Sequence, residues 1–466
     1  MKKHLSGLAK LFVFMLGFAA LVWFANLHLI QTDTFAALTM KEMQQRDDIE
    51  LAFIGSSIVR DHFNVDLITE ETGLTAFDVA IPCASMPATI AVTRELYRTS
   101  LPEWTVMVAE PYNFDTVREG IEAQFKMMPF LSDPSNIIDY YLRLCDEDGY
   151  YFDRMFMFRK FGAQSVSDIV KTIGLRYWPK ATYERLMPTL DPTVVYSGGG
   201  FLRHETDARA DDLIRNSVFR EFTGYKYSLY PESVEQIKLY KQQVEAAGSN
   251  LMVVIFPNHT AHGLAEPGFL DYNESLRALC AELSVPCYDF TLARPELMPV
   301  LDEYYYDLYH MVGEGADIFS EAFCRVFNAH LSGEDVSHLF YADNREYLMS
   351  IDFITNAWVV QYPGGTWNQS WSQDKKTIEA LGKDHDVFMA DSNRGPRLAP
   401  EYRFVIREED GSETLLQDYG VAIYYACEKG ALDGKTLRVY ARVPDAADAQ
   451  EHWFDLAVGA GESSLD

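Results

Sequence analysis

The stretch LAFIGSSIVRDHF, Leu51 to Phe63, decides the fold that we expect for this chain. Its first part is a short apolar run that is typical of a buried strand. Gly55, Ser56 and Ser57 follow where the chain should turn. Ligands of open parallel sheets bind just beyond the carboxyl ends of the strands. The stretch therefore predicts a buried strand that presents a serine hydroxyl at the binding edge of a sheet.

Short apolar, β-rich runs alternate with helical patterns from about residue 50 to residue 330. This alternation is typical of a parallel sheet covered by helices on both faces. The expected strands are LAFIG (51–55), AFDVAI (76–81), TVMVAE (105–110), LMVVIFP (251–257) and CYDF (287–290), and helices are expected near residues 87–99, 231–247 and 271–283. We predict a five-stranded, flavodoxin-like doubly wound sheet in an α/β domain at residues 31–336.

An insertion at about residues 116–230 interrupts this rhythm. It is rich in aromatic residues and Met, and VVYSGGGFLRHETDARADD (194–212) reads as a loop. We interpret the insertion as a mainly helical cap. Its aromatic residues are expected to pack the helices, with a polymer or membrane contact as the alternative: Tyr140, Tyr141, Tyr150, Tyr151, Phe152, Phe156 and Phe158.

Residues 337–466 have a different sequence pattern. Turns rich in Gly and Asp separate runs in which apolar and polar residues alternate. Alternation at period two with regular turns is typical of a β-sandwich. We predict a separate β-sandwich-like domain there. Trp358, Trp367 and Trp371 are expected in its core, with a sugar-stacking platform as the alternative.

The N-terminal segment, residues 1–30, predicts a membrane anchor. Leu11 to Ile30 is apolar and about long enough to span a bilayer. The preceding Lys2, Lys3 and Lys10 should stay in the cytoplasm, so a single-pass protein with most of its chain on the extracytoplasmic side is expected. A cleaved signal peptide is the alternative, although the apolar run is long for one.

The charge balance and the cysteines exclude some classes of function. With 40 basic and 69 acidic side chains, the chain lacks the basic track that nucleic-acid binding requires. The six cysteines show no C-x-x-C spacing, so most should be buried free thiols. Cys280 and Cys287 are close enough in sequence to be checked for a disulfide in an oxidising compartment.

Polar residues beyond the last expected strand could activate a serine at the end of the first. Asp307 and His310 lie three residues apart in YYYDLYHMVGEGADIFSEAF, just before a helical pattern. A serine hydroxyl needs a base to remove its proton, and an imidazole serves best when a carboxylate fixes its tautomer. We predict Ser57 as the nucleophile, His310 as the base and Asp307 as the group that orients it.

Together, G-S-S after the first strand and D-x-x-H before the last helix resemble the SGNH, or GDSL-type, hydrolase superfamily. The resemblance covers about Ile49 to Leu331, without the cap. The G-S-S form on an anchored chain resembles more narrowly the alginate-type polysaccharide O-acetyltransferases and the D-alanyl transfer protein of lipoteichoic acid modification. It implies the same roles for Ser57, His310 and Asp307.

The resemblance also implies an oxyanion hole, for which this chain departs from the family pattern. The family has a glycine after the second strand, and this chain has Cys83 near that position. The backbone N–H of Cys83 could still donate a hydrogen bond to the oxyanion. Asn113, in EPYNFD, stands in for the family's asparagine. With the backbone N–H of Ser57, these two residues form the expected oxyanion hole. The alternative for Asn113 is a turn former, and the Cys83 side chain is expected to be a small buried filler more often than a nucleophile.

Other interpretations of these motifs stay open. Ser57 could cap the following helix, and Asp307 and His310 could be a surface pair. His259 and His262 follow the fourth strand and are weak candidates for substrate contact; no third ligand is suitably spaced for a metal.

The expected function is acyl transfer to a cell-envelope polysaccharide, with esterase activity second. The resemblance and compartment imply an integral-membrane acyltransferase as a partner and no metal or organic cofactor. The alternative is a non-catalytic polysaccharide-binding or envelope assembly protein with a degenerate SGNH fold. An acidic chain favours a neutral or amino-sugar glycan over an anionic one.

Overall fold

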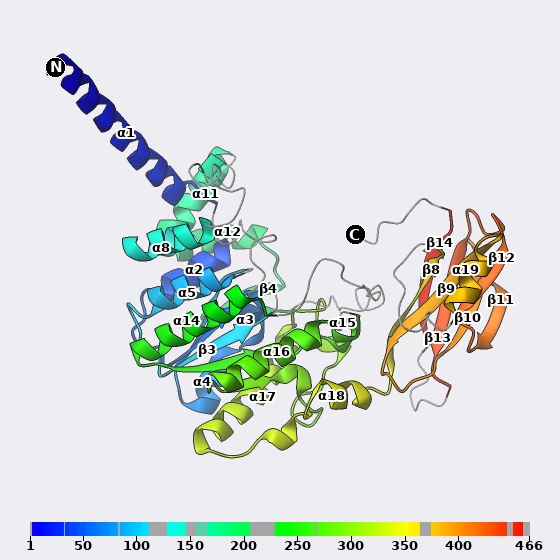
Figure 1. The fold of residues 1–466 in the computed structure, drawn as a ribbon. Helices are drawn as coiled ribbons and strands as arrows, with labels where there is room; N and C mark the ends of the chain where they lie inside the picture. Colours follow the sequence, from blue (N-terminus) through cyan, green and yellow to red (C-terminus); the bar gives the residue numbers. More distant parts are fainter. Residues whose placement is uncertain are drawn as a thin grey trace.

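The computed structural model describes residues 2–31, 33–82, 84–110, 128–145, 165–205, 229–265, 268–363, 374–444 and 451–459, together with residues 156, 158, 159 and 162. Within these residues the chain forms an N-terminal helix, an α/β domain and a β-rich C-terminal domain (Figure 1).

The α/β domain is built on a five-stranded sheet with the order β2-β1-β3-β6-β7, in which every neighbouring pair is parallel. Its strands are β1 (Leu51–Gly55), β2 (Ala76–Ala80), β3 (Trp104–Ala109), β6 (Asn250–Ile255) and β7 (Cys287–Asp289). The order is that of flavodoxin-like folds. The predicted fold class is therefore confirmed, and all five strands lie where the apolar runs placed them.

Helices cover both faces of this sheet. Leu51 and Phe53 of β1 pack in one core cluster with α17 (Gly313–Ser332), whereas Ala52 and Ile54 pack in a second cluster with α5 (Met86–Leu96). The sheet is buried on both sides, which explains why its strands read as continuous apolar runs. The other helices of this domain are α2 (Thr34–Met43), α3 (Ser57–His62), α4 (Val65–Thr72), α14 (Pro231–Ala247), α15 (Thr260–Ala265), α16 (Gly268–Glu282), η3 (Phe290–Leu292) and η4 (Asp302–Tyr304).

The described part of the insertion is helical except for one hairpin. Its helices are η1 (Met128–Phe130), α8 (Pro134–Cys145), α11 (Val166–Tyr177), α12 (Pro179–Leu186) and η2 (Met187–Thr189). The segment that we expected to be a loop instead begins with two antiparallel strands, β4 (Val194–Gly198) and β5 (Phe201–His204). The expectation was wrong because the glycines form the tight turn of a hairpin. A Cβ on Gly200 would lie 2.0 Å from the carbonyl oxygen of Asp78, and its φ is +90°.

The C-terminal domain has two antiparallel sheets that share one core. One sheet has the order β11-β10-β13-β14 and the other β12-β9-β8. The strands are β8 (Ile354–Gln361), β9 (His385–Arg394), β10 (Glu401–Arg407), β11 (Glu413–Gly420), β12 (Tyr424–Glu428), β13 (Thr436–Arg442) and β14 (His452–Ala457), with α19 (Lys375–Leu381) beside β9. Trp358 is 1% exposed, so it is a core residue and not a sugar platform, while Trp367 and Trp371 lie outside the described residues.

Residues 337–350 connect the two domains and pack on the α/β domain. They form η5 (Ser337–Leu339) and α18 (Asn344–Ser350). Leu339 belongs to the same core cluster as β1, and Arg294 of the α/β domain pairs with Glu346 of α18. The boundaries of the domains stay a prediction, but these contacts favour a boundary close to residue 350.

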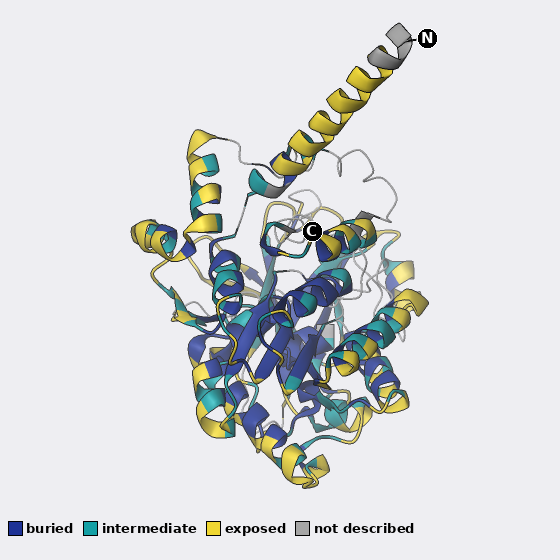
Figure 2. Ribbon diagram, turned by 90° about the vertical axis from the view of Figure 1, so that its left-hand side faces the viewer, coloured by how far each residue is buried: buried dark blue, intermediate teal, exposed yellow. Residues whose placement is uncertain are grey.

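The N-terminal helix α1 (Lys2–His28) extends away from the body, and residues 7–24 are mostly exposed (Figure 2). Residues Gly7–Asn26 have a mean hydropathy of 2.1, and only 6% of the window is buried, which excludes a core helix. Among the described helices it alone is long and apolar enough to cross a membrane. Length and composition do not distinguish an anchor from a signal sequence.

Cys280 and Cys287 are free thiols in the structure, as are Cys324 and Cys427. The pair that we singled out is therefore not joined by a disulfide. Cys83 lies outside the described residues.

Candidate active site

The turn after β1 places Ser57 at the carboxyl edge of the sheet, as the first residue of α3. Gly55 is required there, because a Cβ would lie 2.8 Å from a methyl of Val59 and 3.0 Å from the carbonyl oxygen of Val108. Ser56, and not Ser57, caps the helix: its Oγ accepts a hydrogen bond from the N–H of Ile58 at 3.2 Å. The capping alternative for Ser57 is therefore wrong, and its hydroxyl is available for other contacts.

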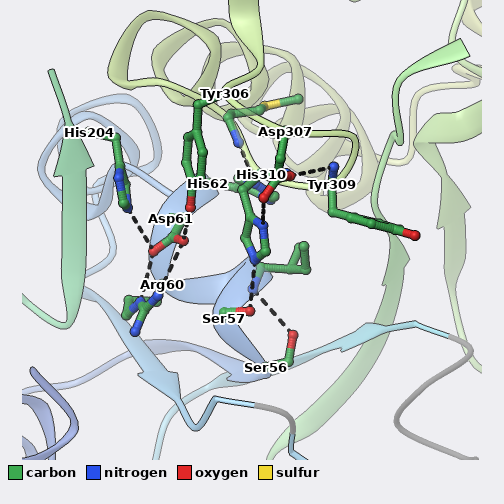
Figure 3. A network of polar contacts seen from close by, with 12 residues as sticks. Ser56, Ser57, Arg60, Asp61, His62, His204, Tyr306, Asp307, Tyr309 and His310 are labelled. Atoms are coloured by element: carbon green, nitrogen blue, oxygen red, sulfur yellow. Dashed lines mark hydrogen bonds and ion pairs between the residues drawn. The ribbon is translucent and has the colours of Figure 1, made fainter. Parts of the chain in front are cut away.

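The structure brings Ser57, His310 and Asp307 together (Figure 3). Ser57 Oγ lies 2.9 Å from His310 Nε2, and His310 Nδ1 lies 2.8 Å from Asp307 Oδ2. The second oxygen of Asp307 accepts hydrogen bonds from the N–H groups of Tyr309 (2.7 Å) and His310 (2.6 Å). A carboxylate accepts from Nδ1–H, so neutral His310 carries its proton on Nδ1 and Nε2 accepts from the Ser57 hydroxyl.

The charges around His310 favour its protonated form. Burial lowers the pKa of His310, but the hydrogen bond and negative charge of Asp307 outweigh it, and the net pKa is raised. The negative charges of Asp61 and Glu110 also raise the pKa of His310 through space. Burial alone would raise the pKa of Asp307, yet the contacts with His310 lower it overall. Asp307 therefore remains ionised and stabilises an imidazolium when His310 takes a proton.

A buried polar network, which the sequence did not reveal, lies against the other side of His310. The ring of Tyr306 stacks between His310 and His204, at centroid distances of 5.6 and 4.6 Å. The Tyr306 hydroxyl donates to Asp61 Oδ2 at 3.1 Å, and Asp61 also pairs with Arg60 at 2.8 Å and lies 3.5 Å from His204 Nε2. Figure 3 shows this group of side chains beside the Ser57–His310 pair. His204 comes from the hairpin, so the insertion contributes to the site.

Asp61 stays charged in this network despite its burial. Burial raises its pKa, but the charge of Arg60 and the hydrogen bonds to His204 and Arg60 lower it well below the usual range. Its anion is held in place by cationic and hydroxyl donors.

His62, the neighbour of Asp61, is fully buried and holds the chain that follows His310. Its Nε2 accepts a hydrogen bond from the N–H of Met311 at 2.9 Å, and its ring stacks on Phe256 at 4.4 Å. Burial lowers the pKa of His62 well below its ordinary value, and the nearby His310 charge lowers it further. His62 is therefore neutral, and it positions His310 through its hydrogen bond with the next residue, Met311.

Glu110, at the carboxyl end of β3, is the second acidic group near the nucleophile. Its Oε1 accepts a hydrogen bond from the Ser56 hydroxyl. Burial raises its pKa from 4.5 to about 7, although the Ser56 hydrogen bond and the His310 charge oppose the shift. The sequence placed EPYN at this strand end, but nothing in it indicated a carboxyl group that is protonated near neutral pH.

The remaining predicted site residues are only partly placed. Cys83 and Asn113 lie outside the described residues, so the oxyanion hole stays a prediction. His259 is 3% exposed, and its nitrogens contact Asp302 Oδ1 at 2.8 Å and the N–H of Ala261 at 3.1 Å. His262 is 2% exposed, and burial lowers its pKa to about 4. Their contact with a substrate stays a prediction that this packing does not favour.

Within the described part of the chain, no group of three or more His, Cys, Asp or Glu side chains could hold a metal ion.

No family model and no curated protein sequence matches this chain. Among solved structures, it is similar to the crystal structure of a putative acylhydrolase from Bacteroides fragilis. The two share 11% sequence identity and a TM-score of 0.30, over 66% of this chain and 93% of that chain. A likeness at this level supports no conclusion about activity, so the functional proposal depends on the geometry of the site.

Proposed function

We propose that the chain is an SGNH-type serine enzyme that transfers an acyl group to a cell-envelope polysaccharide, with ester hydrolysis as its second activity. The observation that carries the proposal is the continuous pair of contacts from Ser57 Oγ to His310 Nε2 at 2.9 Å and from His310 Nδ1 to Asp307 Oδ2 at 2.8 Å. A serine in contact with an oriented imidazole is the arrangement that activates a hydroxyl for attack on an acyl carbon.

In the first step, Ser57 Oγ attacks the carbonyl carbon of the acyl donor and His310 Nε2 takes the hydroxyl proton. The tetrahedral intermediate then collapses, the bond to the leaving group breaks, and His310 returns the proton to that group. The N–H of Ser57 is one donor for the oxyanion, because the first N–H groups of a helix have no partner within it. Asp307 keeps the imidazole in the tautomer that this step requires.

The second step releases the acyl group from Ser57. A polysaccharide hydroxyl gives its proton to His310 Nε2 and attacks the acyl carbon, after which the proton returns to Ser57 Oγ. Water in place of the sugar hydroxyl gives hydrolysis. The chemistry of both steps requires no metal or organic cofactor.

We place this reaction outside the cytoplasmic membrane, with α1 as a single-pass anchor. The supporting feature is the apolar window Gly7–Asn26 with Lys2 and Lys3 before it. Activated acyl thioesters stay in the cytoplasm, so an integral-membrane acyltransferase is the partner that would deliver the acyl group.

The test compares Ser57→Ala with Ser56→Ala, a matched control one residue away. Hydrolysis of p-nitrophenyl acetate should fall by a factor on the order of 10⁴ or more in Ser57→Ala. Ser56→Ala should keep much of the activity, because its hydroxyl contacts Glu110 and the helix end and not His310. It should lose about 1 kcal/mol of stability with its helix cap.

A fluorophosphonate probe reports the nucleophile without turnover. Ser57 Oγ would displace fluoride and form an ester to phosphorus, which mass spectrometry locates. Labelling should persist in Ser56→Ala and disappear in Ser57→Ala. Equal hydrolysis and labelling in wild type and Ser57→Ala would refute Ser57 as the nucleophile, whereas no hydrolysis and no labelling of the wild type would favour the polysaccharide-binding alternative.

A further inference from the structure

One face of α11 carries exposed apolar side chains in a helical register. Val166, Val170, Ile173 and Tyr177 lie at i, i+4, i+7 and i+11 and are 79%, 51%, 37% and 49% exposed. The opposite face packs into the body through Leu175, which is fully buried. α11 is thus apolar toward solvent as well as toward the core. We call these four residues the α11 stripe.

The α11 stripe ends beside the last turn of α1. The Tyr177 hydroxyl is hydrogen-bonded to His28 Nδ1 at 2.9 Å, and the two rings stack at 6.2 Å. Arg176 Nη1 lies 3.3 Å from the same nitrogen. Ile30 forms a β-bridge with Gly162, just before α11. Figure 1 shows α11 at the end of α1, on the side of the body from which α1 emerges.

These contacts fix the height of the α11 stripe relative to the apolar window of α1. The window ends at Asn26, two residues before His28. If α1 spans a bilayer, His28 lies at the level of the lipid headgroups, and Tyr177 lies within hydrogen-bonding distance of it. The nearest apolar phase for the α11 stripe is therefore the bilayer that holds α1.

The composition around the α11 stripe suits a lipid interface. Trp178 follows it and is 64% exposed, and tryptophan and tyrosine are enriched at membrane interfaces. Lys171, Arg176 and Lys180 supply positive charge in a chain whose formal net charge is −29. Helices with an apolar face and basic flanks bind in the plane of the interface. Isolated exposed apolar residues are ordinary, but a continuous stripe next to a membrane helix is not.

We propose that the α11 stripe binds the surface of the bilayer that α1 spans. This inference rests on the proposed membrane anchor. Two membrane contacts, α1 and α11, would then hold the insertion in a fixed orientation. The insertion continues through α12 to the hairpin that places His204 against Asp61 and Tyr306. The distance and orientation of the site relative to the membrane would consequently be fixed.

The test uses the full chain in nanodiscs of phosphatidylethanolamine and phosphatidylglycerol. An NBD fluorophore is attached at Ile173→Cys or, as a matched control, at Glu184→Cys on the exposed side of α12. The unsubstituted chain, labelled in parallel, gives the background from the native cysteines. The label at 173 should emit at shorter wavelength and be quenched by doxyl-labelled lipid, whereas the label at 184 should behave as in water.

A second variant separates lipid contact from folding. Adding Val170→Glu to the labelled Ile173→Cys chain should abolish the quenching, with unchanged circular dichroism and unchanged hydrolysis of a soluble ester. Water-like emission at 173 in a chain that still elutes with nanodiscs would overturn the inference and leave the anchor intact. Elution apart from nanodiscs would overturn both.

Photocrosslinking distinguishes lipid from a protein partner as the group that contacts the α11 stripe. With benzoylphenylalanine at position 173 in cells, lipid contact should give adducts without a discrete shift on a gel. A single protein adduct of defined mass would overturn the inference in favour of a membrane protein partner.

Discussion

Replacing Glu110 by Gln should make the protein more stable above neutral pH and leave its stability nearly unchanged at pH 4.5 and below. The substitution keeps an oxygen that can accept from the Ser56 hydroxyl, as Oε1 of Glu110 does. It removes only the ability to ionise. Any difference between the two chains therefore reports the cost of placing a charge at this strand end.

The sign and the pH window follow from the raised pKa of Glu110, which is 4.5 ordinarily and about 7 in the fold. Below pH 4.5 the carboxyl is protonated in both the folded and the unfolded chain, so it contributes no difference. Between 4.5 and about 7 the unfolded chain loses the proton while the folded chain keeps it, and stability falls with pH. Above 7 both chains are ionised, and the folded chain carries the cost of the charge at this strand end.

The size of the cost follows from the same shift. A difference of about 2.5 pKa units corresponds to about 3 kcal/mol. Glu110 is partly exposed, and solvent screening reduces that value, so we expect a gain of about 1 to 3 kcal/mol for Glu110→Gln at pH 8.

The assay is urea unfolding of both chains in the same detergent at pH 4.5, 6 and 8, followed by far-UV circular dichroism. The free energies of unfolding of the variant and the wild type are subtracted at each pH, which cancels effects common to both chains. The difference should be near zero at pH 4.5 and rise toward pH 8. A difference that does not change with pH would refute the raised pKa of Glu110, and a difference that falls with pH would reverse its sign.

Two further predictions concern the base and the domain boundary. Asp307→Asn should lower the rate of ester hydrolysis by a factor on the order of 10⁴, since the imidazole loses the carboxylate that orients it. The acid limb of the pH–rate profile, which reports the protonation of His310, should also move to lower pH, because Asp307 raises the pKa of His310. An acid limb at the same pH in Asp307→Asn as in the wild type would contradict this role of Asp307. A chain ending at residue 350 should unfold as cooperatively as the intact α/β domain, whereas one ending at residue 336 should lose several kcal/mol with Leu339, which is buried in its core. Equal unfolding curves for the two truncated chains would show that residues 337–350 add nothing.

The sheet could be predicted because its signal is local. Strands buried on both faces read as short apolar runs, and LAFIG matches β1 residue for residue. The G-S-S turn followed from its position at a strand end. The hairpin at residues 194–204 was missed because its strands are short and half-exposed, and its three glycines are typical of a loop as well as of a turn.

The environment of the candidate site could not be predicted, because its contacts join residues far apart in sequence. Asp61 and His62 lie in the opening stretch and are polar residues, yet they are 1% and 0% exposed. Their partners are His204 and Met311, and only the folded chain brings these together. Residue type alone gives no indication that this pair of neighbouring polar residues is buried.

Three carboxyl groups act on His310, and they differ in how their charge is compensated. Asp61 is ionised and pairs with Arg60 at 2.8 Å, and its charge still raises the pKa of His310. Glu110 is protonated below about pH 7, because burial disfavours its charged form. Asp307 is the one of the three that is hydrogen-bonded to the imidazole, through His310 Nδ1 at 2.8 Å. Above pH 7 Glu110 ionises, and its charge raises the pKa of His310 further. The fraction of neutral His310 therefore increases less with pH than it would if Asp307 were the only carboxyl group near it.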